Sequence, residues 1–194
     1  NKPNVKLVDV SETPIDRILP SGIEHKGIEH QFDSIVFATG FDAMTGALFN
    51  IDIRGRDGRS LKEKWDGGPQ TYLGLTTNGF PNMFTVTGPG SPSVLTNMLP
   101  SIEQHVNFIS DCISYMRENG HSKIEPELEA ELNWGVHVNE VADLSLRSTC
   151  ASWYVGANVP GKPRVFTPYI GGFPRYVERC KSVVANGYEG FSLA

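Results

Sequence analysis

The residues best suited to chemistry lie in one stretch, residues 87–106, where a Gly/Pro cluster is followed by helical periodicity. An apolar run at 83–86 precedes it, and we expect that run to be a short buried strand. Asn97 is the predicted N-cap of the helix, which places Pro100 in the first turn, where its missing N–H costs nothing. The first N–H groups of a helix lack internal partners and carry partial positive charge. The stretch therefore predicts a place that receives an anion or an electron-rich ring edge.

Other side chains that could bind a metal are predicted to be structural. His105 lies beside the helix's apolar stripe and has no ligand partner at metal spacing. His137 and Glu140 are three residues apart and read as an ordinary surface pair, because two groups alone do not make a metal site. We therefore expect no metal.

Composition limits the function classes. A net charge of -5 and a pI near 5.5 argue against a nucleic-acid partner. No apolar run approaches the roughly 20 residues that cross a bilayer, so no membrane role is expected. The three cysteines, Cys112, Cys150 and Cys180, are odd in number and form no C-x-x-C pair, which favours a reducing, cytoplasmic location. Cys112 and Cys180 are predicted to be buried.

The N-terminal part has the short, β-branched runs of an antiparallel meander. We expect strands at 5–10 and 15–18, with Pro20-Ser21-Gly22 as the next turn. The run at 32–38 is apolar enough for a strand inside a sheet covered on both faces. It ends on Thr39-Gly40, where the absence of Cβ would let the backbone approach a cofactor.

The middle of the chain is predicted to be irregular up to residue 82 and helical after Asn97. Residues 44–82 read as short strands and loops, with Trp65 and Tyr72 as packing residues that cover a sheet. The helix carries an apolar stripe that must be buried, and it ends at Asn119-Gly120. The stripe consists of Ile102, Val106, Ile109, Ile113 and Met116.

The C-terminal part is predicted to hold two more helices around a loop. One helix begins at 125–126, and Gly135 weakens its pattern. Residues 150–162 form a loop that acts as a lid or lining, because the pair Trp153 and Tyr154 would seek contact area. Residues 164–170 read as a strand. The last helix has the apolar positions Phe173, Val177, Cys180 and Val184 and stops at Asn186-Gly187.

Three motifs in order carry a family resemblance. They are Ala38-Thr39-Gly40-Phe41-Asp42, the stretch at 87–106, and Trp153-Tyr154-Val155-Gly156-Ala157-Asn158-Val159-Pro160-Gly161-Lys162. With them the chain resembles, over residues 5–191, the C-terminal part of a Baeyer–Villiger monooxygenase of the cycloalkanone type. It lacks G-x-G-x-x-G and F-x-G-x-x-x-H-x-x-x-W/F, so it resembles a fragment of a larger enzyme.

The resemblance implies an α/β fold, part of a flavoprotein with two dinucleotide-binding domains, with short antiparallel strands and about three helices. Residues 1–39 would be the end of the NADP-binding domain and the crossover strand. Residues 40–194 would be the C-terminal part of the FAD-binding domain, with a mobile loop at about 150–163. The rest of the parent polypeptide would be its partner.

The resemblance also implies an activity: with FAD and NADPH, one oxygen of O2 is inserted next to a ketone carbonyl to give an ester or lactone. The implied site residues are Gly40, Phe41, Asp42, Asn97 and Met98 for FAD, Trp153 for NADP, and Ser93, Val94, Leu95 and Thr167 for the ketone pocket. The catalytic arginine and both dinucleotide fingerprints would lie upstream of residue 1, which would leave the fragment alone inactive. Two alternatives stay open: an N- or S-oxidising flavin monooxygenase, and a cofactor-free interaction module whose turn at 88–97 binds a peptide or nothing.

Overall fold

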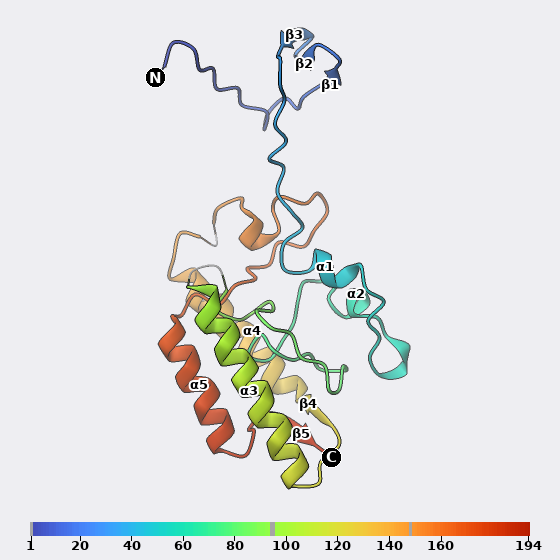
Figure 1. The fold of residues 1–194 in the computed structure, drawn as a ribbon, viewed down its shortest axis with the longest axis vertical. Coiled ribbons are helices and arrows are strands. Elements are labelled where there is room, and N and C mark those ends of the chain that lie inside the picture. The colour runs from blue at the N-terminus through green and yellow to red at the C-terminus, as the bar shows by residue number, and fades with distance from the viewer. Residues whose placement is uncertain (1, 94–95, 148) are drawn as a thin grey trace. The chain divides into compact units, whose positions relative to one another are not determined.

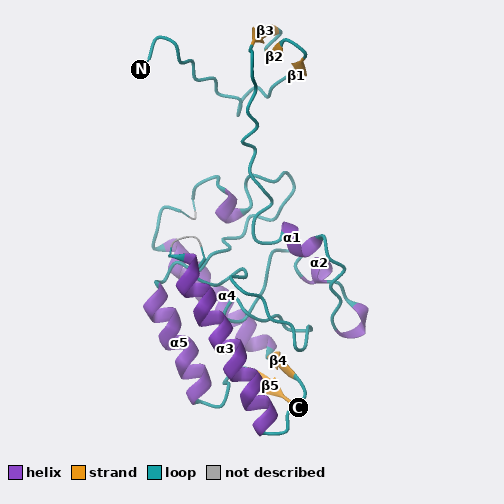
Figure 2. Cartoon of the chain, viewed as in Figure 1, coloured by secondary structure: helices purple, strands orange, loops and turns teal. Residues whose placement is uncertain are grey.

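The computed structural model describes residues 2–93, 96–147 and 149–194. They divide into two compact units, Asn1–Gly40 and Phe41–Ala194 (Figure 1). The described residues form short antiparallel strands and three long helices (Figure 2), so the predicted α/β class is confirmed. Within these ranges no helix is both long and apolar enough to span a membrane.

The first unit is an antiparallel meander, as predicted. Its strands are β1 (Arg17–Leu19), β2 (Gly22–His25) and β3 (Ile28–Gln31), in that order. Gly22 has to be glycine, because a Cβ there would lie 1.9 Å from the His30 carbonyl oxygen. The strand predicted at 5–10 was wrong: these residues form no ladder and are exposed.

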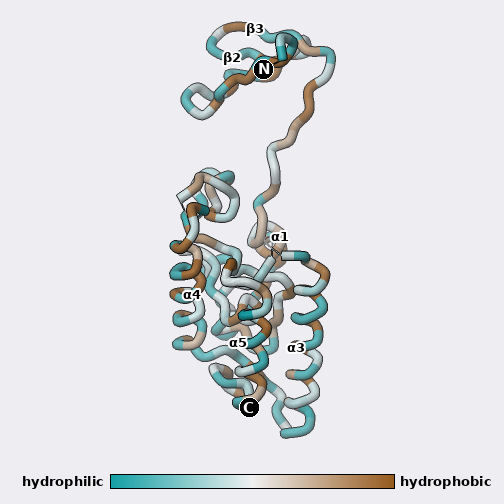
Figure 3. Tube along the Cα trace, turned by 90° about the vertical axis from the view of Figure 1, so that its left-hand side faces the viewer, coloured by the Kyte–Doolittle hydropathy of each residue, from teal (hydrophilic) through white to brown (hydrophobic). Residues whose placement is uncertain are grey.

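The apolar run at 32–38 is not a strand in this chain, so that prediction was also wrong. Val36 is 88% exposed and Phe37 66%, and Figure 3 shows the hydrophobic colour along this extended segment. A strand needs a neighbour for its N–H and C=O groups. The strands of the described ranges pair only within the meander or as β4 with β5, so the segment has no ladder to join.

The second unit is built on α3 (Met98–Glu118), α4 (Leu128–Asp143) and α5 (Phe173–Ala185). Two strands, β4 (Ile124–Pro126) and β5 (Phe191–Leu193), pair antiparallel beside them. The helix start predicted at 125–126 was wrong, because these residues pair with β5 and the helix begins after its N-cap, Glu127. α4 continues through Gly135 without a break.

The three helices share one core, but of the predicted α3 stripe only Met116 is buried, Ile109 is half-buried and the other three residues are exposed. Ile102 is 37% exposed, Val106 46% and Ile113 40%. The buried side of α3 carries Ser101, His105, Phe108, Cys112 and Met116. α3 is therefore apolar on two adjoining faces. On its buried side, Ser101 Oγ and His105 Nδ1 bond to backbone groups, which periodicity does not reveal, while His105 Nε2 has no partner among the described residues.

The predicted α5 stripe was only partly right. Cys180 is buried as predicted, but Tyr176 and Val183 accompany it, and Val184 is 37% exposed. Cys112 is also buried, as predicted, and burial raises the pKa of its thiol to about 11.

The irregular region before residue 82 contains less strand than expected. It has the short helices α1 (Gly46–Phe49) and α2 (Leu61–Lys64), the 3-10 turn η1 (Arg56–Gly58), and isolated bridges in place of strands. Trp65 and Tyr72 are packing residues as predicted, each 2% exposed. Tyr72 packs on Phe191 of β5, with 5.1 Å between ring centroids, as the predicted sheet-covering role requires, whereas Trp65 packs among residues of the irregular region and covers no sheet.

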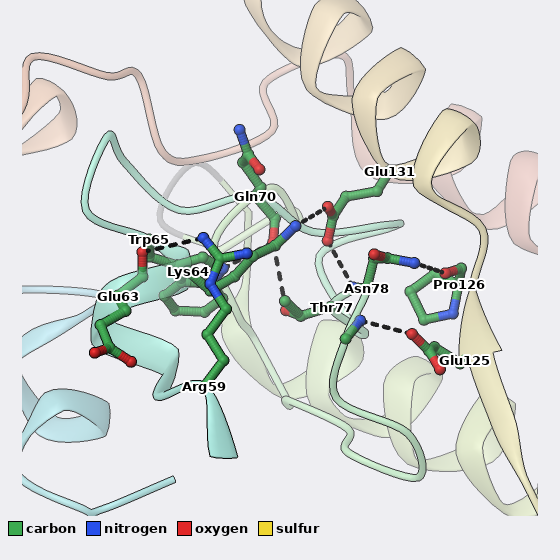
Figure 4. A network of polar contacts seen from close by, with 11 residues as sticks. Arg59, Glu63, Lys64, Trp65, Gln70, Thr77, Asn78, Glu125, Pro126 and Glu131 are labelled. Carbon is green, nitrogen blue, oxygen red and sulfur yellow. Dashed lines mark hydrogen bonds and ion pairs between the residues drawn. The ribbon is translucent and has the colours of Figure 1, made fainter. Parts of the chain in front are cut away.

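Buried carboxylates attach this region to α4 and β4 (Figure 4). Lys64 Nζ donates to Glu131 Oε2 at 2.7 Å, and the Asn78 N–H donates to Glu131 Oε1 at 2.7 Å. Glu125 accepts from the Gly79 N–H at 2.6 Å. These bonds replace the water that the carboxylates lose on burial, so each buried acid has its own partners.

Candidate functional site

The turn at residues 87–93 is held from several sides. The Thr71 hydroxyl donates to the Pro89 carbonyl oxygen at 2.7 Å, and Trp134 Nε1–H on α4 donates to the Gly90 carbonyl oxygen at 3.0 Å. The Gly90 N–H donates to the Thr167 carbonyl oxygen at 2.6 Å. The backbone of the turn is therefore fixed by contacts with three distant parts of the sequence.

A second turn, at residues 73–75, packs against the turn at 87–93. Gly74, at φ +70°, lies so near that a Cβ would be 2.3 Å from the Ser91 nitrogen. Thr85, which lies just before the first turn, bonds to the second: its N–H donates to the Leu75 carbonyl oxygen at 2.8 Å and its hydroxyl to the Gly74 carbonyl oxygen at 3.1 Å. The strand predicted at 83–86 was wrong, because this segment makes turn contacts and no ladder.

Residues 164–170 are extended but are not a strand, which corrects another prediction. They bond to the turn at 87–93 at single points, with the Tyr169 N–H donating to the Ser91 carbonyl oxygen at 3.0 Å. Thr167 is 5% exposed, and both its N–H and its hydroxyl donate to the Tyr154 carbonyl oxygen, at 2.9 and 3.1 Å. Thr167 thus joins the turn to the loop at 150–162.

The N-terminus of α3 is capped as predicted. Asn97 Oδ1 accepts from the Leu99 N–H at 3.1 Å, and Pro100 has no N–H to satisfy. Met98 is 37% exposed and Leu99 73%, so this helix end is open. The Met98 N–H, in the first turn of α3, has no partner among the residues described.

Ser93 is the described member of the predicted pocket bulge. It is 1% exposed, and its hydroxyl has no hydrogen-bond partner among the described residues. A buried hydroxyl normally has a partner, so this group is suited to meeting a polar atom that the described residues do not supply. The other predicted bulge residues, Val94 and Leu95, lie outside the described residues.

The loop at 150–162 is fastened to the segment after Gly40. Asn158 Nδ2 donates to the Phe41 carbonyl oxygen at 2.8 Å, and Lys162 Nζ donates to the Asp42 carboxylate. Lys162 also reaches the Ala43 carbonyl oxygen at 3.2 Å. We call these contacts, from Asn158 and Lys162 to residues 41–43, the loop latch. It joins two predicted motifs that are more than a hundred residues apart.

The loop holds its aromatic pair in a compact 3-10 turn, η2 (Trp153–Val155). The Trp153 ring is half-buried and packs on Tyr154 with 4.4 Å between ring centroids. At the other side of the latch, Gly40 has φ +76° with open space around its Cβ position, and Phe41 is 88% exposed. Both features leave this segment free to contact a large ligand.

The structure brings together part of the predicted site. The latch joins Asp42 to the predicted NADP loop, and Thr167 joins that loop to the turn at 87–93. No hydrogen bond links Asn97 or Met98 to residues 41–43 among those the structure describes.

Sequence reasoning missed the side chains that hold the turn. These are Thr71, Trp134 and His105, whose Nδ1 accepts from the Thr87 N–H at 3.0 Å. Each side chain forms a hydrogen bond with a backbone group of the turn, and no sequence motif predicts such a contact. One usable signal was the polar residue on the buried side of an amphipathic helix, since such a side chain needs a partner.

Comparison with known proteins identifies the class. No protein-family model matches the chain. It is 46% identical to acetone monooxygenase (methyl acetate-forming) of Gordonia sp. (strain TY-5), 42% to cyclopentanone 1,2-monooxygenase of Comamonas sp. (strain NCIMB 9872) and 39% to phenazine N-monooxygenase PhzNO1 of Lysobacter antibioticus. Each match covers the whole chain but only 35–37% of the relative, so the chain spans about a third of their length.

Solved structures agree. A closed cyclohexanone monooxygenase superimposes on the whole chain with a TM-score of 0.91 at 44% identity, over 36% of its own length. A complex of the protein OTEMO with FAD and NADP gives a TM-score of 0.86 at 41% identity, also over 36% of its length. The chain is therefore homologous to a segment of flavin-dependent monooxygenases. More narrowly, the predicted resemblance to Baeyer–Villiger monooxygenases of the cycloalkanone type is confirmed.

Proposed function

We propose that this chain is a segment of a FAD- and NADPH-dependent Baeyer–Villiger monooxygenase that converts a ketone and O2 into an ester or lactone. The observation that carries the proposal is the match of the whole chain, at 46% and 42% identity, to two ketone monooxygenases. Residues 1–39 are assigned to the end of the NADP-binding domain and the crossover strand, and residues 40–194 to the FAD-binding domain. The cellular location proposed is the cytoplasm.

The residues present fit the flavin. Bound FAD would supply O2 activation, and NADPH the electrons. The open end of α3 offers the Met98 N–H to an acceptor on the ring edge, beside the Asn97 cap. The helix dipole there favours negative charge by roughly 0.3–2 kcal/mol. Gly40, Phe41 and Asp42 complete the proposed flavin contacts from the segment that carries the latch.

The loop at 150–162 is proposed to cover NADP. The latch fixes its far end, and the Tyr154 carbonyl, bound by Thr167, fixes its near end. Trp153 directly precedes the near fixed point and packs on Tyr154, so its ring is positioned to exclude water from a bound nicotinamide cofactor.

The ketone is proposed to lie beside Ser93, Val94 and Leu95, with Thr167 at the pocket's base. The unpartnered Ser93 hydroxyl would orient a polar atom of the bound molecules, and the apolar side chains would select by size.

A second candidate is N-oxidation, and one observation favours it: a relative at 39% identity is named a phenazine N-monooxygenase. This relative is less similar to the chain than the two ketone monooxygenases are, so N-oxidation is the second candidate. The relatives give no support to the cofactor-free interaction module, because all three of these proteins are named as monooxygenases.

The test uses the full polypeptide that contains this chain. With FAD, NADPH and cyclopentanone or acetone, it should consume NADPH in step with the ketone and form the corresponding lactone or ester. The isolated 194-residue chain should show neither activity nor tight FAD binding, because it has no glycine-rich phosphate loop. Ketone-dependent NADPH consumption by the isolated chain would overturn the assignment as a segment.

A further inference from the structure

Two residues near the proposed pocket adopt an unfavourable backbone conformation. Thr87 has φ +54° and Leu73 has φ +58°. Non-glycine residues rarely adopt this left-handed region, and a β-branched residue such as Thr87 is a clear outlier. Such strain persists only where the surroundings impose it, and it concentrates at functional sites.

His105 on α3 is what holds Thr87. The Thr87 N–H donates to His105 Nδ1 at 3.0 Å, which closes the chain from the start of the turn back onto the helix that follows it. His105 is fully buried, so no water competes for its nitrogen. Because Nδ1 accepts, the ring must be neutral.

A tyrosine on α5 holds Leu73 in the same way. The Tyr176 hydroxyl donates to the Leu73 carbonyl oxygen at 2.8 Å. The Tyr176 ring meets the His105 ring edge to face, with 5.6 Å between centroids and an angle of 71°. One packed His–Tyr pair therefore holds both strained residues.

These residues begin the two turns that interlock at the proposed site. Gly74, which follows Leu73, packs against the Ser91 nitrogen, and a Cβ on Gly88, which follows Thr87, would lie 2.6 Å from the Gly74 carbonyl oxygen. A change at Thr87 would therefore be passed along a rigid, tightly packed backbone to Ser93.

We propose that His105 is a positioning residue for the monooxygenase reaction: by accepting the Thr87 N–H it fixes the turn that positions Ser93. The inference rests on the proposed function. It concerns the hydrogen bond and not merely the volume of the ring, and this distinction can be tested.

The experiment compares two variants of the full, FAD-loaded polypeptide. His105→Phe keeps the ring and its contact with Tyr176 but removes the acceptor. His105→Asn keeps an acceptor near the Nδ1 position but loses the ring volume. The control is His121→Phe, since His121 is a half-buried histidine stacked on Tyr115, beyond the end of α3.

The readouts are ester formed per NADPH, hydrogen peroxide released per NADPH, kcat and KM for the ketone, FAD content and the visible flavin spectrum. In His105→Phe, kcat should fall roughly tenfold, because a small misplacement of the site has that effect. KM should stay within about twofold, peroxide per NADPH should rise and the flavin spectrum should shift. His105→Asn should be nearer to wild type in all of these, and His121→Phe should match wild type.

The two His105 variants separate the hydrogen bond from the packing of the ring. If His105→Phe couples as well as His105→Asn or better, the ring matters only as packing and the proposal is wrong. If His105→Asn alone retains FAD, the proposal requires that this variant still couples NADPH consumption to ester formation, and uncoupling would overturn it. Failure of both variants to bind FAD would also overturn the proposal. A wild-type enzyme that forms no ester from ketones would instead refute the proposed function.

Discussion

The loop latch makes a quantitative prediction about cofactor retention. In Lys162→Met the aliphatic stem is kept, while the bonds to the Asp42 carboxylate and the Ala43 carbonyl are lost. A hydrogen bond to a charged group contributes about 1.5–3 kcal/mol. The Asp42 side chain is 37% exposed and that of Lys162 13%, so solvent screening reduces this to about 1–2 kcal/mol. The ratio of fastened to released loop should fall by about 5- to 30-fold.

The assay is the dissociation rate of NADP+ from the full enzyme, measured by stopped flow, together with hydrogen peroxide released per NADPH. Both should increase, because the loop that covers the cofactor opens more often. Lys181→Met is the matched control, since Lys181 is an exposed lysine on α5. If Lys162→Met releases NADP+ at a rate within twofold of wild type, the latch does not hold the loop during turnover and the reasoning is wrong.

Three further predictions concern stability. Gly74→Ala should abolish folding or FAD retention, because its Cβ would clash with backbone, whereas Gly120→Ala, at φ +72° with nothing within 4 Å, should cost only about 1 kcal/mol of strain in a thermal melt. Lys64→Met should destabilise the enzyme by about 3–5 kcal/mol, because the buried carboxylate of Glu131 loses its counter-ion. Arg56→Met should cost only about 1 kcal/mol, because the Arg56 side chain is 53% exposed. Equal losses of stability in the two variants would contradict this reasoning. Burial lowers the pKa of His105 from 6.5 to about 4, so this residue contributes about 3 kcal/mol to the stability of the folded state above pH 6.5, and that contribution is lost as the pH falls toward 4. The free energy of unfolding should therefore depend less on acid pH in His105→Asn. An unchanged pH dependence in this variant would refute the prediction.

That pH prediction rests on surroundings without charge. Burial is the one cause of the lowered His105 pKa, and the ring that faces it, Tyr176, is itself buried and has its pKa raised by burial. Tyr176 stays neutral over the range from pH 7 to 4. Titration of Tyr176 therefore adds nothing to that of His105 in this range.

Sequence reasoning succeeded where the cause is local. The Asn97 cap depends only on a side-chain oxygen that accepts from the Leu99 N–H two residues later. The end of α3 at Asn119 depends on the glycine that follows it. The meander likewise follows from short strands separated by turn residues. Three long motifs in the right order also revealed the family resemblance.

It failed where a segment's structure depends on partners elsewhere. Residues 32–38 have the composition of a buried strand but no ladder to join in the described chain. The wrong face of α3 was chosen because both faces are apolar, and the decisive groups were polar ones with backbone partners, such as His105. The latch was missed because it joins one ion pair and two side chain–backbone bonds over a separation of more than a hundred residues.

The most direct test of the assignment follows the oxygen atom. The full polypeptide, loaded with FAD, would be given NADPH, cyclopentanone and 18O2, and the product analysed by mass spectrometry. We expect a lactone two mass units heavier than the unlabelled one, with the label in the ring oxygen and one NADPH consumed per lactone. An unlabelled product, or NADPH consumption that yields only hydrogen peroxide while an aromatic amine is N-oxidised efficiently, would contradict the assignment.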